Sequence, residues 1–396
     1  MTRPTGPTVL MLTPWMKMGY GVAEAVASLS RGLTALGYPT VVGALGEDGS
    51  FADVDVREIT PDAARITALA ARLGASVAVA HGSPFFEVLP ELPMGTIAYE
   101  YGDPTPQLFE ADAEERSRIA AAKRTQVYPA VGAVACISNF IRHDIGWPDA
   151  RVIPLGIEHI PDLGPKPLVP PVSADRPLRV GTLMRLGAGE AHYKGNHLLP
   201  ALRVEVHRHR PATQFEVMGR GTEADATVLR DAGFLVHLNA SDHDRQEFLR
   251  TIDVFVSPSQ WEGCNLPLVE AQALGTPGLA FDTGAHPEFT PLVFPSLNLL
   301  ARQIVAYDDD RSGLLRQHGR AGYTFVRETM SWEQATHRLA DLIREVDPGA
   351  APSRPPRSSQ VRVLARRTKA AVKEHGVQES AKRAVRKVVP KKPPTH

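Results

Sequence analysis

The stretch Ser259-Gln260-Trp261-Glu262-Gly263-Cys264-Asn265-Leu266-Pro267-Leu268-Val269-Glu270 decides how this chain is interpreted. The apolar run at residues 254–256 just before it predicts a buried parallel strand, and residues 266–274 predict a helix after the loop. Two carboxylates, Glu262 and Glu270, therefore frame a strand–loop–helix junction, where α/β proteins commonly hold phosphate groups. The same pattern also fits a capped helix in which Glu270 only faces the helix dipole.

Outward from this stretch, strand and helix patterns alternate through both halves of the chain. Strands are predicted at residues 8–12, 40–42, 76–80, 96–99, 133–137, 151–155, 178–183, 214–218, 235–238, 254–256 and 278–281. Helices are predicted at residues 22–36, 63–73, 113–123, 197–208, 223–232, 244–249, 266–274 and 331–346. This alternation is typical of doubly wound sheets, so we expect an α/β protein with two Rossmann-like domains and a ligand cleft between them.

Prolines mark the boundary between the two halves. They stand at positions 161, 165, 167, 170, 171 and 177. A proline-rich stretch of this kind is typical of a linker between domains. The predicted parts are a first domain at 1–160, a linker at 161–177, a second domain at 178–330, a helix at 331–346 and a tail at 347–396.

The composition, with 43% hydrophobic and 22% charged residues, is that of a soluble globular protein. The two cysteines, Cys136 and Cys264, lie far apart in the sequence, which argues neither for a disulfide framework nor for a zinc site. No run approaches the ~20 apolar residues that span a bilayer. We therefore expect a cytoplasmic protein.

The net charge of zero hides an uneven distribution of charge. Residues 347–396 carry 13 Lys and Arg against 3 Asp and Glu, whereas residues 1–346 carry 31 against 41. The basic segment at 359–392 has a Val and Ala face at helical spacing, which suits peripheral contact with an anionic membrane. A disordered, solvated tail fits the same composition. Nucleic acid is a poorer partner, because the tail lacks aromatic side chains that stack on bases.

Two further groups of residues suit a phosphate-bearing ligand. Arg185 and Lys194 follow the first predicted strand of the second half, and two fixed cations on a glycine-bearing loop suit a diphosphate. Gly19 and Gly21 follow the first strand of the chain and let its backbone approach a ligand closely. The plainer alternatives are solvated surface cations and an incomplete G-x-G-x-x-G pattern, which is weak evidence for a dinucleotide site.

Acidic residues in the first half suit an acceptor group. Glu100, with Tyr101 and Asp103, comes at the carboxyl end of a predicted strand, although Asp103 equally suits a helix cap. The D-x-D patterns at 53–55 and 242–244 resemble divalent-cation ligands, but the first lacks a long apolar strand before it and the second reads as a helix cap. We discount both and expect no metal site.

The residues quoted so far carry a resemblance to a known family. Glu262-Gly-Cys-Asn-Leu-Pro-Leu-Val-Glu270, followed by Ala271-Gln-Ala-Leu-Gly-Thr-Pro277, resembles the E-x7-E signature of retaining, GT-B-fold glycosyltransferases of family 4, the group 1 glycosyltransferases. Other pieces match in order over about residues 8–346: the Gly19/Gly21 loop, Leu36-Gly37-Tyr38, Ile137-Ser138, Arg151-Val-Ile-Pro-Leu-Gly-Ile-Glu158, Arg185, Lys194-Gly195, Asp282-Thr-Gly-Ala-His-Pro-Glu288 and Ser331-Trp332.

The sequence also departs from the family pattern. Tyr99-Glu100-Tyr101 stands where many relatives place a histidine, and Cys264 and Asn265 stand where Phe and Gly are common. The first departure concerns the acceptor side of the reaction. The second concerns how tightly the loop wraps the donor sugar.

The resemblance implies transfer of a sugar from a nucleotide-diphosphate donor, UDP- or GDP-linked, to a hydroxyl of a glycan, glycolipid or secondary metabolite, as in polysaccharide biosynthesis. It implies retention at the anomeric carbon and no metal cofactor. The helix at 331–346 would cross back to the first domain. The residues it assigns are Arg185 and Lys194 for the diphosphate, Glu270 for the ribose, Glu262 with the loop Gly263, Cys264, Asn265 and Leu266 for the sugar, and Gly19 and Gly21 from the first domain.

Glu262 is the catalytic candidate on the donor side, and Glu100 is the candidate on the acceptor side. A nucleotide-sugar epimerase or a sugar phosphorylase is a second enzymatic interpretation of the same fold. A non-catalytic scaffold that binds a sugar or a polymer is an interpretation of another class, and the joint presence of Arg185, Lys194, Glu262 and Glu270 speaks against it.

Overall fold

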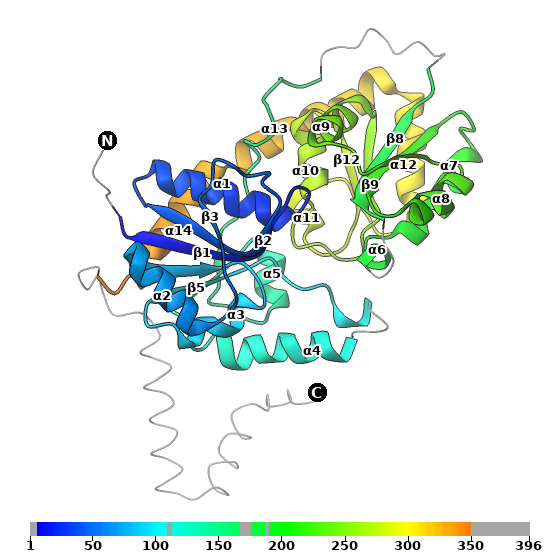
Figure 1. Cartoon of the computed structure of the whole chain (residues 1–396). Coiled ribbons are helices and arrows are strands. Elements are labelled where there is room, and N and C mark those ends of the chain that lie inside the picture. The colour runs from blue at the N-terminus through cyan, green and yellow to red at the C-terminus, as the bar shows by residue number, and fades with distance from the viewer. Residues whose placement is uncertain (1–5, 109–112, 167–175, 187–189, 350–396) are drawn as a thin grey trace, which may run out of the picture. The chain divides into compact units, whose positions relative to one another are not determined.

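The computed structural model describes residues 6–108, 113–166, 176–186 and 190–349. The basic tail predicted at residues 347–396, including the segment at 359–392, lies almost wholly outside the described residues. So do Gly187 to Gly189 of the predicted glycine-bearing loop and residues 167–175 of the predicted linker. Everything below concerns the described part of the chain (Figure 1).

Among the described residues, the first half of the chain forms a parallel sheet of seven strands in the order β3-β2-β1-β4-β5-β6-β7. The chain first builds outward from β1 to β3 and then returns to place β4 on the other side of β1, which makes the gap between β1 and β4 a topological switch point. The strands are β1 (Thr8–Met16), β2 (Thr40–Glu47), β3 (Val56–Glu58), β4 (Ala75–Ala80), β5 (Gly95–Glu100), β6 (Ala133–Cys136) and β7 (Arg151–Val152).

The second half repeats this plan with six parallel strands among the described residues, in the order β10-β9-β8-β11-β12-β13. Its switch point lies between β8 and β11. The strands are β8 (Arg179–Arg185), β9 (Gln214–Arg220), β10 (Leu235–Leu238), β11 (Val254–Ser257), β12 (Gly278–Phe281) and β13 (Val293–Phe294). Strands buried on both faces need continuous apolar runs, which is why Leu10 to Leu12 and Val254 to Val256 are fully buried.

Helices and short helical turns connect these strands. In the first half they are α1 (Gly21–Ala35), α2 (Ala63–Leu73), α3 (Phe85–Val88), η1 (Leu89–Glu91), η2 (Pro106–Leu108), α4 (Ala113–Ala122), the π-helical turn η3 (Lys123–Val127) and α5 (Asn139–Asp144). In the second half they are α6 (Glu190–Tyr193), η4 (Asn196–Leu198), α7 (Leu199–His207), α8 (Glu223–Asp231), α9 (Asp242–Thr251), α10 (Leu266–Ala273), α11 (His286–Phe289), α12 (Leu297–Asp309), the π-helical turn η5 (Arg311–Leu315), α13 (Arg316–Thr329) and α14 (Trp332–Val346). None of the helices in the described residues is both long enough and apolar enough to cross a membrane.

Capping residues fix where several of these helices begin. Ser241 accepts a hydrogen bond from the backbone N–H of Asp244, and the Asp244 carboxylate accepts in return from the backbone N–H of Ser241, at 3.2 Å each. This reciprocal capping box satisfies two of the orphan N–H groups of α9. It accounts for Asp244 of the D-x-D pattern at 242–244, which serves the helix as expected from its position in the sequence.

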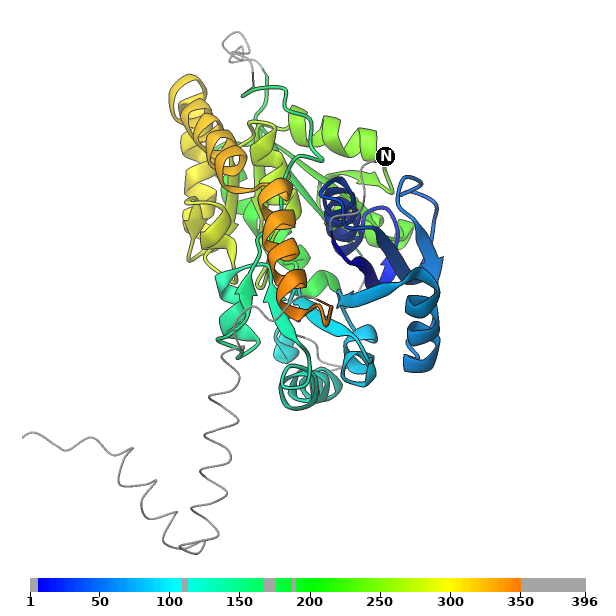
Figure 2. The same ribbon diagram turned by 90° about the vertical axis from the view of Figure 1, so that its left-hand side faces the viewer.

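Helix α14 packs on the first sheet although it is the last helix of the described chain. It contacts α1 and β5, and Figure 2 shows it in orange beside the blue and cyan elements of the first half. Gly32 of α1 permits this close approach, because a Cβ there would come within 3.0 Å of the Thr336 side chain. The C-terminal end of the described chain is thereby tied to the first half.

The sequence patterns predict no element between residues 282 and 330, where the structure has α11, β13, α12, η5 and α13. Helix α13 is hard to recognise because Gly319 and Gly322 weaken its helical propensity. Packing explains both glycines, since a Cβ at Gly319 would come within 3.0 Å of the Gly275 carbonyl, and one at Gly322 would press on the Gln272 side chain at 3.0 Å. Tertiary contact with α10 therefore outweighs propensity here.

Candidate functional site

A pocket of about 410 Å³ lies at the carboxyl ends of strands of both sheets, beside β1 in the first sheet and at the switch point between β8 and β11 in the second. Its wall includes residues that follow β1, β5, β8, β9 and β11, and it is lined by residues of both halves of the chain. Ligands of open α/β sheets bind at this place, because adjacent loops diverge there and helix N-termini face the opening. The pocket is therefore the candidate functional site.

The structure brings most of the predicted site residues to this pocket and leaves two out. The two that do not line it are Glu270 and Glu100. The predicted residues that line it are Gly19, Gly21, Arg185, Lys194, Glu262, Gly263, Cys264, Asn265 and Leu266.

Lys194 and Glu262 form an ion pair inside the pocket. The Lys194 Nζ donates to Glu262 Oε1 at 2.7 Å, and the Glu262 side chain is 7% exposed. Burial lowers the pKa of Lys194, but the Glu262 carboxylate and Tyr193 raise it by more, so the net pKa lies above its usual 10.5. The amine is consequently a fixed positive charge at neutral pH.

Glu270 is buried on the first turns of α10, 3% exposed. One carboxylate oxygen lies 3.0 Å from His159 Nε2, and the other accepts from Arg245, which itself lines the pocket. Burial alone would raise the pKa of Glu270, but Arg245 and His159 lower it to about 2. Glu270 is therefore an ionised carboxylate that stands behind Arg245.

The tautomer of His159 follows from its second contact. The indole N–H of Trp332 can only donate, and it lies 3.2 Å from His159 Nδ1. His159 Nδ1 therefore accepts, and Nε2 carries the hydrogen that is donated to Glu270. Trp332 of α14 is thereby connected through His159 to the Glu270 carboxylate.

The loop between Glu262 and Leu266 is held by contacts on several sides. Asn265 caps α10 by accepting from the Leu268 N–H at 3.3 Å, and its amide donates to Ser257 at 2.7 Å. The same amide lies 3.1 Å from His286 Nε2. These contacts occupy the Asn265 side chain. Asn265 therefore contributes to the pocket through its backbone and by holding the loop in place.

Glycines let the loop lie against its neighbours. A Cβ on Gly263 would come within 3.0 Å of the Tyr101 carbonyl oxygen, which belongs to the first half of the chain. A Cβ on Gly284, whose φ is +59°, would meet the backbone of Glu262. The backbone therefore passes where side chains could not.

Gly19 and Gly21 bring the first half to the pocket. Gly19 has a φ of +76°, which favours glycine, and a Cβ there would lie 2.8 Å from Arg220 Nε. Gly21 begins α1, and a Cβ there would lie 3.2 Å from the end of the Leu266 side chain. Both glycines thus face residues of the second half.

Two cations of the pocket were not found in the sequence. Arg220 ends β9, next to Arg185 at the end of β8, and Arg245 lies in the first turn of α9. Arg220 could have been recognised from the sequence, because it follows a predicted strand and precedes Gly221. Arg185 was recognised from the same kind of position, as a cation that follows a predicted strand. Arg245 gave no such signal, because a charged residue in a polar helix is usually a surface residue.

Glu100 takes a different place from the one predicted. Its carboxylate is buried, 2.9 Å from Lys123 Nζ and 2.6 Å from the Tyr128 hydroxyl. Successive side chains of a strand point to opposite faces, so Tyr101 rather than Glu100 lines the pocket. We leave Glu100 out of the proposed site.

Further contacts join the two halves beside the pocket. The Ser138 hydroxyl at the start of α5 donates to the Gly263 carbonyl at 2.9 Å. The Glu288 carboxylate accepts from the backbone N–H groups of Asn139 and Phe140 at 2.9 and 2.6 Å. A carboxylate from the second half therefore caps a helix of the first half.

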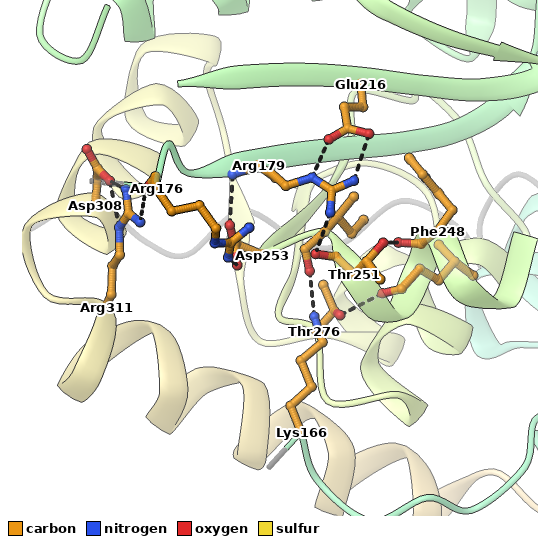
Figure 3. Close-up of polar contacts among 12 residues, drawn as sticks. Lys166, Arg176, Arg179, Glu216, Phe248, Thr251, Asp253, Thr276, Asp308 and Arg311 are labelled. Atoms are coloured by element: carbon orange, nitrogen blue, oxygen red, sulfur yellow. Dashed lines mark hydrogen bonds and ion pairs between the residues drawn. The ribbon is translucent and has the colours of Figure 1, made fainter. Parts of the chain in front are cut away.

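Charged residues also gather at the opposite edge of the second sheet, as Figure 3 shows. Asp253 precedes β11 and accepts from the backbone N–H of Arg179, at the start of β8, at 2.8 Å, and from Arg176 at 2.5 Å. Lys166 donates to the Ile252 carbonyl at 2.5 Å, and burial lowers its pKa to about 7. These contacts attach both described ends of the proline-rich segment to the second half, away from the pocket.

No three His, Cys, Asp or Glu side chains of the described residues gather closely enough to hold a metal ion. In the D-x-D pattern at 53–55, the two aspartates pair with Arg31 and Arg57.

Comparison with known families identifies the part of the chain that carries the charged wall of the pocket. Residues 181–309 match the family model described as glycosyl transferases, group 1. This segment contains Arg185, Lys194, Arg220, Arg245 and Glu262. Over these residues the chain is similar to the group 1 glycosyl transferases. No curated protein sequence matches the chain.

Solved structures of glycosyltransferases share the fold of the described chain. Sucrose-phosphate synthase from Thermosynechococcus elongatus aligns with a TM-score of 0.70 at 17% identity over 85% of this chain and 98% of its own. HepE from Anabaena, in complex with UDP and glucose, aligns with a TM-score of 0.65 at 15% identity over 85% of this chain and 99% of its own. WaaG, a glycosyltransferase involved in lipopolysaccharide biosynthesis, aligns with a TM-score of 0.58 at 13% identity over 85% and 99%.

Identities this low show the fold alone. The predicted fold class is thereby confirmed: the described chain forms two parallel, Rossmann-like α/β domains in the GT-B arrangement.

Proposed function

We propose that this protein transfers a sugar from a nucleotide-diphosphate-sugar to an acceptor hydroxyl, with retention at the anomeric carbon and without a metal cofactor. The observation that carries the proposal is the charge of the pocket. Its described lining residues include four cations, Arg185, Lys194, Arg220 and Arg245, and a single carboxylate, Glu262. This excess of positive charge suits a diphosphate leaving group.

The cations act on the bond that breaks. When the sugar leaves, negative charge develops on the diphosphate, and fixed donors such as Lys194 stabilise that charge without reorganising. Lys194 is paired with Glu262, so a bound diphosphate would share the amine with that carboxylate. The N-terminus of α10 adds the partial positive charge of its free N–H groups.

Glu262 and the backbone of residues 263–266 hold the donor sugar in this proposal, and Glu270 binds the ribose. Glu270 is ionised and already engages Arg245 at the pocket wall. Because the other carboxylate oxygen is held by His159, a ribose hydroxyl would take the place of Arg245 on Glu270.

A UDP-linked sugar is the donor we propose first. Support comes from the complexes of Anabaena HepE with UDP and glucose and with UDP-glucose, in a protein of the same fold. Retention and metal independence are supported by the E-x7-E signature and by the cations that take the place of a metal ion in the pocket.

A thermal-shift screen of UDP-, GDP-, ADP- and dTDP-sugars tests donor binding, because a ligand that binds only the folded state raises its stability. We expect the largest rise with UDP-sugars, unchanged by EDTA. UDP-glucose is then incubated with 4-nitrophenyl glycosides as acceptors. Release of UDP together with an α-linked product is the expected result.

Other products would overturn the proposal. An isomerised donor with no release of UDP identifies an epimerase, and a phosphate-dependent product identifies a phosphorylase. Absence of binding by every nucleotide-sugar identifies a non-catalytic scaffold. An inverted product rejects the retaining mechanism alone.

We also propose the predicted division of the chain, with a boundary at residues 161–177, and peripheral membrane contact by the basic segment at 359–392. The support for the second is its charge, 13 Lys and Arg against 3 Asp and Glu in residues 347–396. Binding to phosphatidylserine vesicles should fall with salt and be lost on truncation after Pro348. Equal binding by the truncated chain rejects this role.

A further inference from the structure

The wall that the first half contributes to the pocket offers few groups that can bind an acceptor. Its described lining residues carry no charged side chain, and only two of them, Tyr20 and Tyr101, carry a polar side chain. Tyr20 lies under the Arg185 guanidinium, 5.3 Å from ring centroid to Cζ, and so belongs with the cations. Tyr101 is the polar group of this wall that stands apart from them.

Tyr101 directly follows β5 and is held by a residue of the neighbouring strand. Its hydroxyl lies 3.0 Å from Nδ1 of His81, which directly follows β4. The His81 backbone N–H donates to the Leu12 carbonyl of β1 at 2.8 Å, so the histidine sits at the switch point of the first sheet. Tyr99 packs edge-on against both rings, with centroids 5.2 and 5.3 Å away.

The environment of the pair keeps both groups uncharged. His81 is 2% exposed, and burial lowers its pKa to about 3. Burial, together with Tyr99, raises the pKa of Tyr101 well above its usual value of 10. Neither group is suited to take a proton from a substrate, so what the pair fixes is the direction of a hydrogen bond.

The direction follows from the second nitrogen of the ring. His81 Nε2 is buried and has no hydrogen-bond partner among the described residues. A buried N–H without a partner is rarer in proteins than an acceptor without one, which favours the tautomer with the hydrogen on Nδ1. Nδ1–H then donates to Tyr101, and the Tyr101 O–H is left to donate to another oxygen.

We propose that Tyr101 donates its hydroxyl hydrogen to the reacting hydroxyl of the acceptor, and that His81 is the positioning residue that aims it. The inference rests on the proposed function and assigns the acceptor side of the same pocket. Tyr101 is suited to this place because its own carbonyl touches the Gly263 loop on the donor side. It therefore stands where the two substrates would meet.

Four variants test the pair: Tyr101→Phe, His81→Asn, His81→Gln and the double variant Tyr101→Phe/His81→Gln. The asparagine amide can replace Nδ1, whereas the longer glutamine amide reaches the place of Nε2. With UDP-glucose and 4-nitrophenyl glycosides, we expect Tyr101→Phe and His81→Gln each to lower kcat/KM for the acceptor about tenfold. His81→Asn should stay within about threefold of the wild type.

The double variant separates positioning from a general structural role. If His81 acts through the Tyr101 hydroxyl, His81→Gln should add no further loss in the Tyr101→Phe background. The Kd for UDP should be unchanged in all variants, because the cations of the donor wall are untouched. If His81→Gln fails to fold, as a thermal melt would show, Tyr101→Phe and His81→Asn still carry the test.

The proposal is overturned if Tyr101→Phe keeps the wild-type kcat/KM for the acceptor. It is also overturned if His81→Asn and His81→Gln are equally active, or if the losses of the two single variants multiply in the double variant. These outcomes all require an active wild-type enzyme. A wild type that binds no nucleotide-sugar and transfers none rejects the proposed function itself, and this inference with it.

Discussion

The two walls of the pocket differ in how they are charged. Every charged residue among its described lining residues comes from the second half, namely Arg185, Arg220, Lys194, Arg245 and Glu262. The first half contributes glycines, apolar side chains and the two tyrosines. A wall built to hold a diphosphate needs permanent charge, whereas a wall that receives a neutral hydroxyl needs shape and a directed hydrogen bond.

Charge and burial alone do not decide which carboxylates belong to the pocket. The carboxylates Glu270 and Glu100 are both buried and both paired with cations. Glu270 pairs with a cation of the pocket wall, whereas Glu100 pairs with Lys123, which does not line that pocket. Burial and ion pairing therefore do not separate these two carboxylates, whereas the position of the cationic partner does.

The largest effect should come from removing a charge of the donor wall. Lys194→Met keeps the length of the side chain and deletes the amine, so we expect kcat for UDP release to fall about 10²- to 10³-fold. The matched control is Arg208→Met, an exposed cation on the C-terminal side of α7 paired with Glu205. Steady-state kinetics with UDP-glucose measure both. Equal rates in the two variants would remove Lys194 from the leaving-group site.

A second test removes the cation between Glu270 and the pocket. Arg245→Met leaves the buried Glu270 carboxylate with the Nε2–H of His159 as its remaining hydrogen-bond partner, and we expect the free energy of unfolding at pH 7 to fall by about 2 kcal/mol. The control is Arg250→Met on the same helix, an exposed partner of Glu247 whose loss should cost less than about 0.5 kcal/mol. Urea unfolding compares them.

The pKa of Glu270 predicts how the stability difference between the wild type and Arg245→Met changes with pH. The folded-state pKa of Glu270 is lowered to about 2 from 4.5, so its ionised form adds stability above about pH 4.5 that is lost as the pH falls through 2. The wild type and Arg245→Met should therefore differ most at neutral pH and converge in acid. A gap that stays constant from pH 7 to pH 2 would show that Arg245 stabilises the fold without acting on Glu270.

The two walls also differ in how many of their residues could be predicted from the sequence. Glu262, Lys194 and Arg185 were found because short motifs after predicted strands carry them, and local order in the chain fixes their place. Arg245 was missed because it reaches the pocket from a polar helix that only tertiary packing brings there. The doubly wound fold itself was predictable, since strand and helix periods alternate regularly.

On the first wall, the sequence pointed to Glu100, whereas its neighbour Tyr101 lines the pocket. Glu100 and Tyr101 are neighbours, and a carboxylate attracts attention as a catalytic group. Which of the two faces the pocket depends on the pleat of β5 relative to the second half. His81 could not be linked to Tyr101, because the pairing of β4 with β5 is a long-range contact.

A third test examines whether stability and transfer depend on the close contact between Gly263 and the Tyr101 carbonyl, which joins the two walls. Gly263→Ala places a Cβ within 3.0 Å of the Tyr101 carbonyl, a backbone atom that cannot move aside, whereas Gly21→Ala meets the flexible end of Leu266 at 3.2 Å. We expect Gly263→Ala to cost about 1–3 kcal/mol of stability and to slow transfer more than UDP binding. Gly21→Ala should have a smaller effect on both. Similar values for the two variants in thermal melts and kinetics would show that the walls do not close on this contact.

The smallest effect concerns Tyr20, where the first wall supports a cation of the second. The Arg185 guanidinium lies over the Tyr20 ring at 5.3 Å. A cation–π contact of this kind contributes about 0.5–1 kcal/mol. Tyr20→Leu should therefore weaken UDP binding about two- to fivefold in calorimetry, and Tyr20→Phe, which keeps the ring, should bind as the wild type does. If the Phe variant loses as much as the Leu variant, the hydroxyl rather than the ring serves the donor, and the first wall has a polar role on the nucleotide side as well.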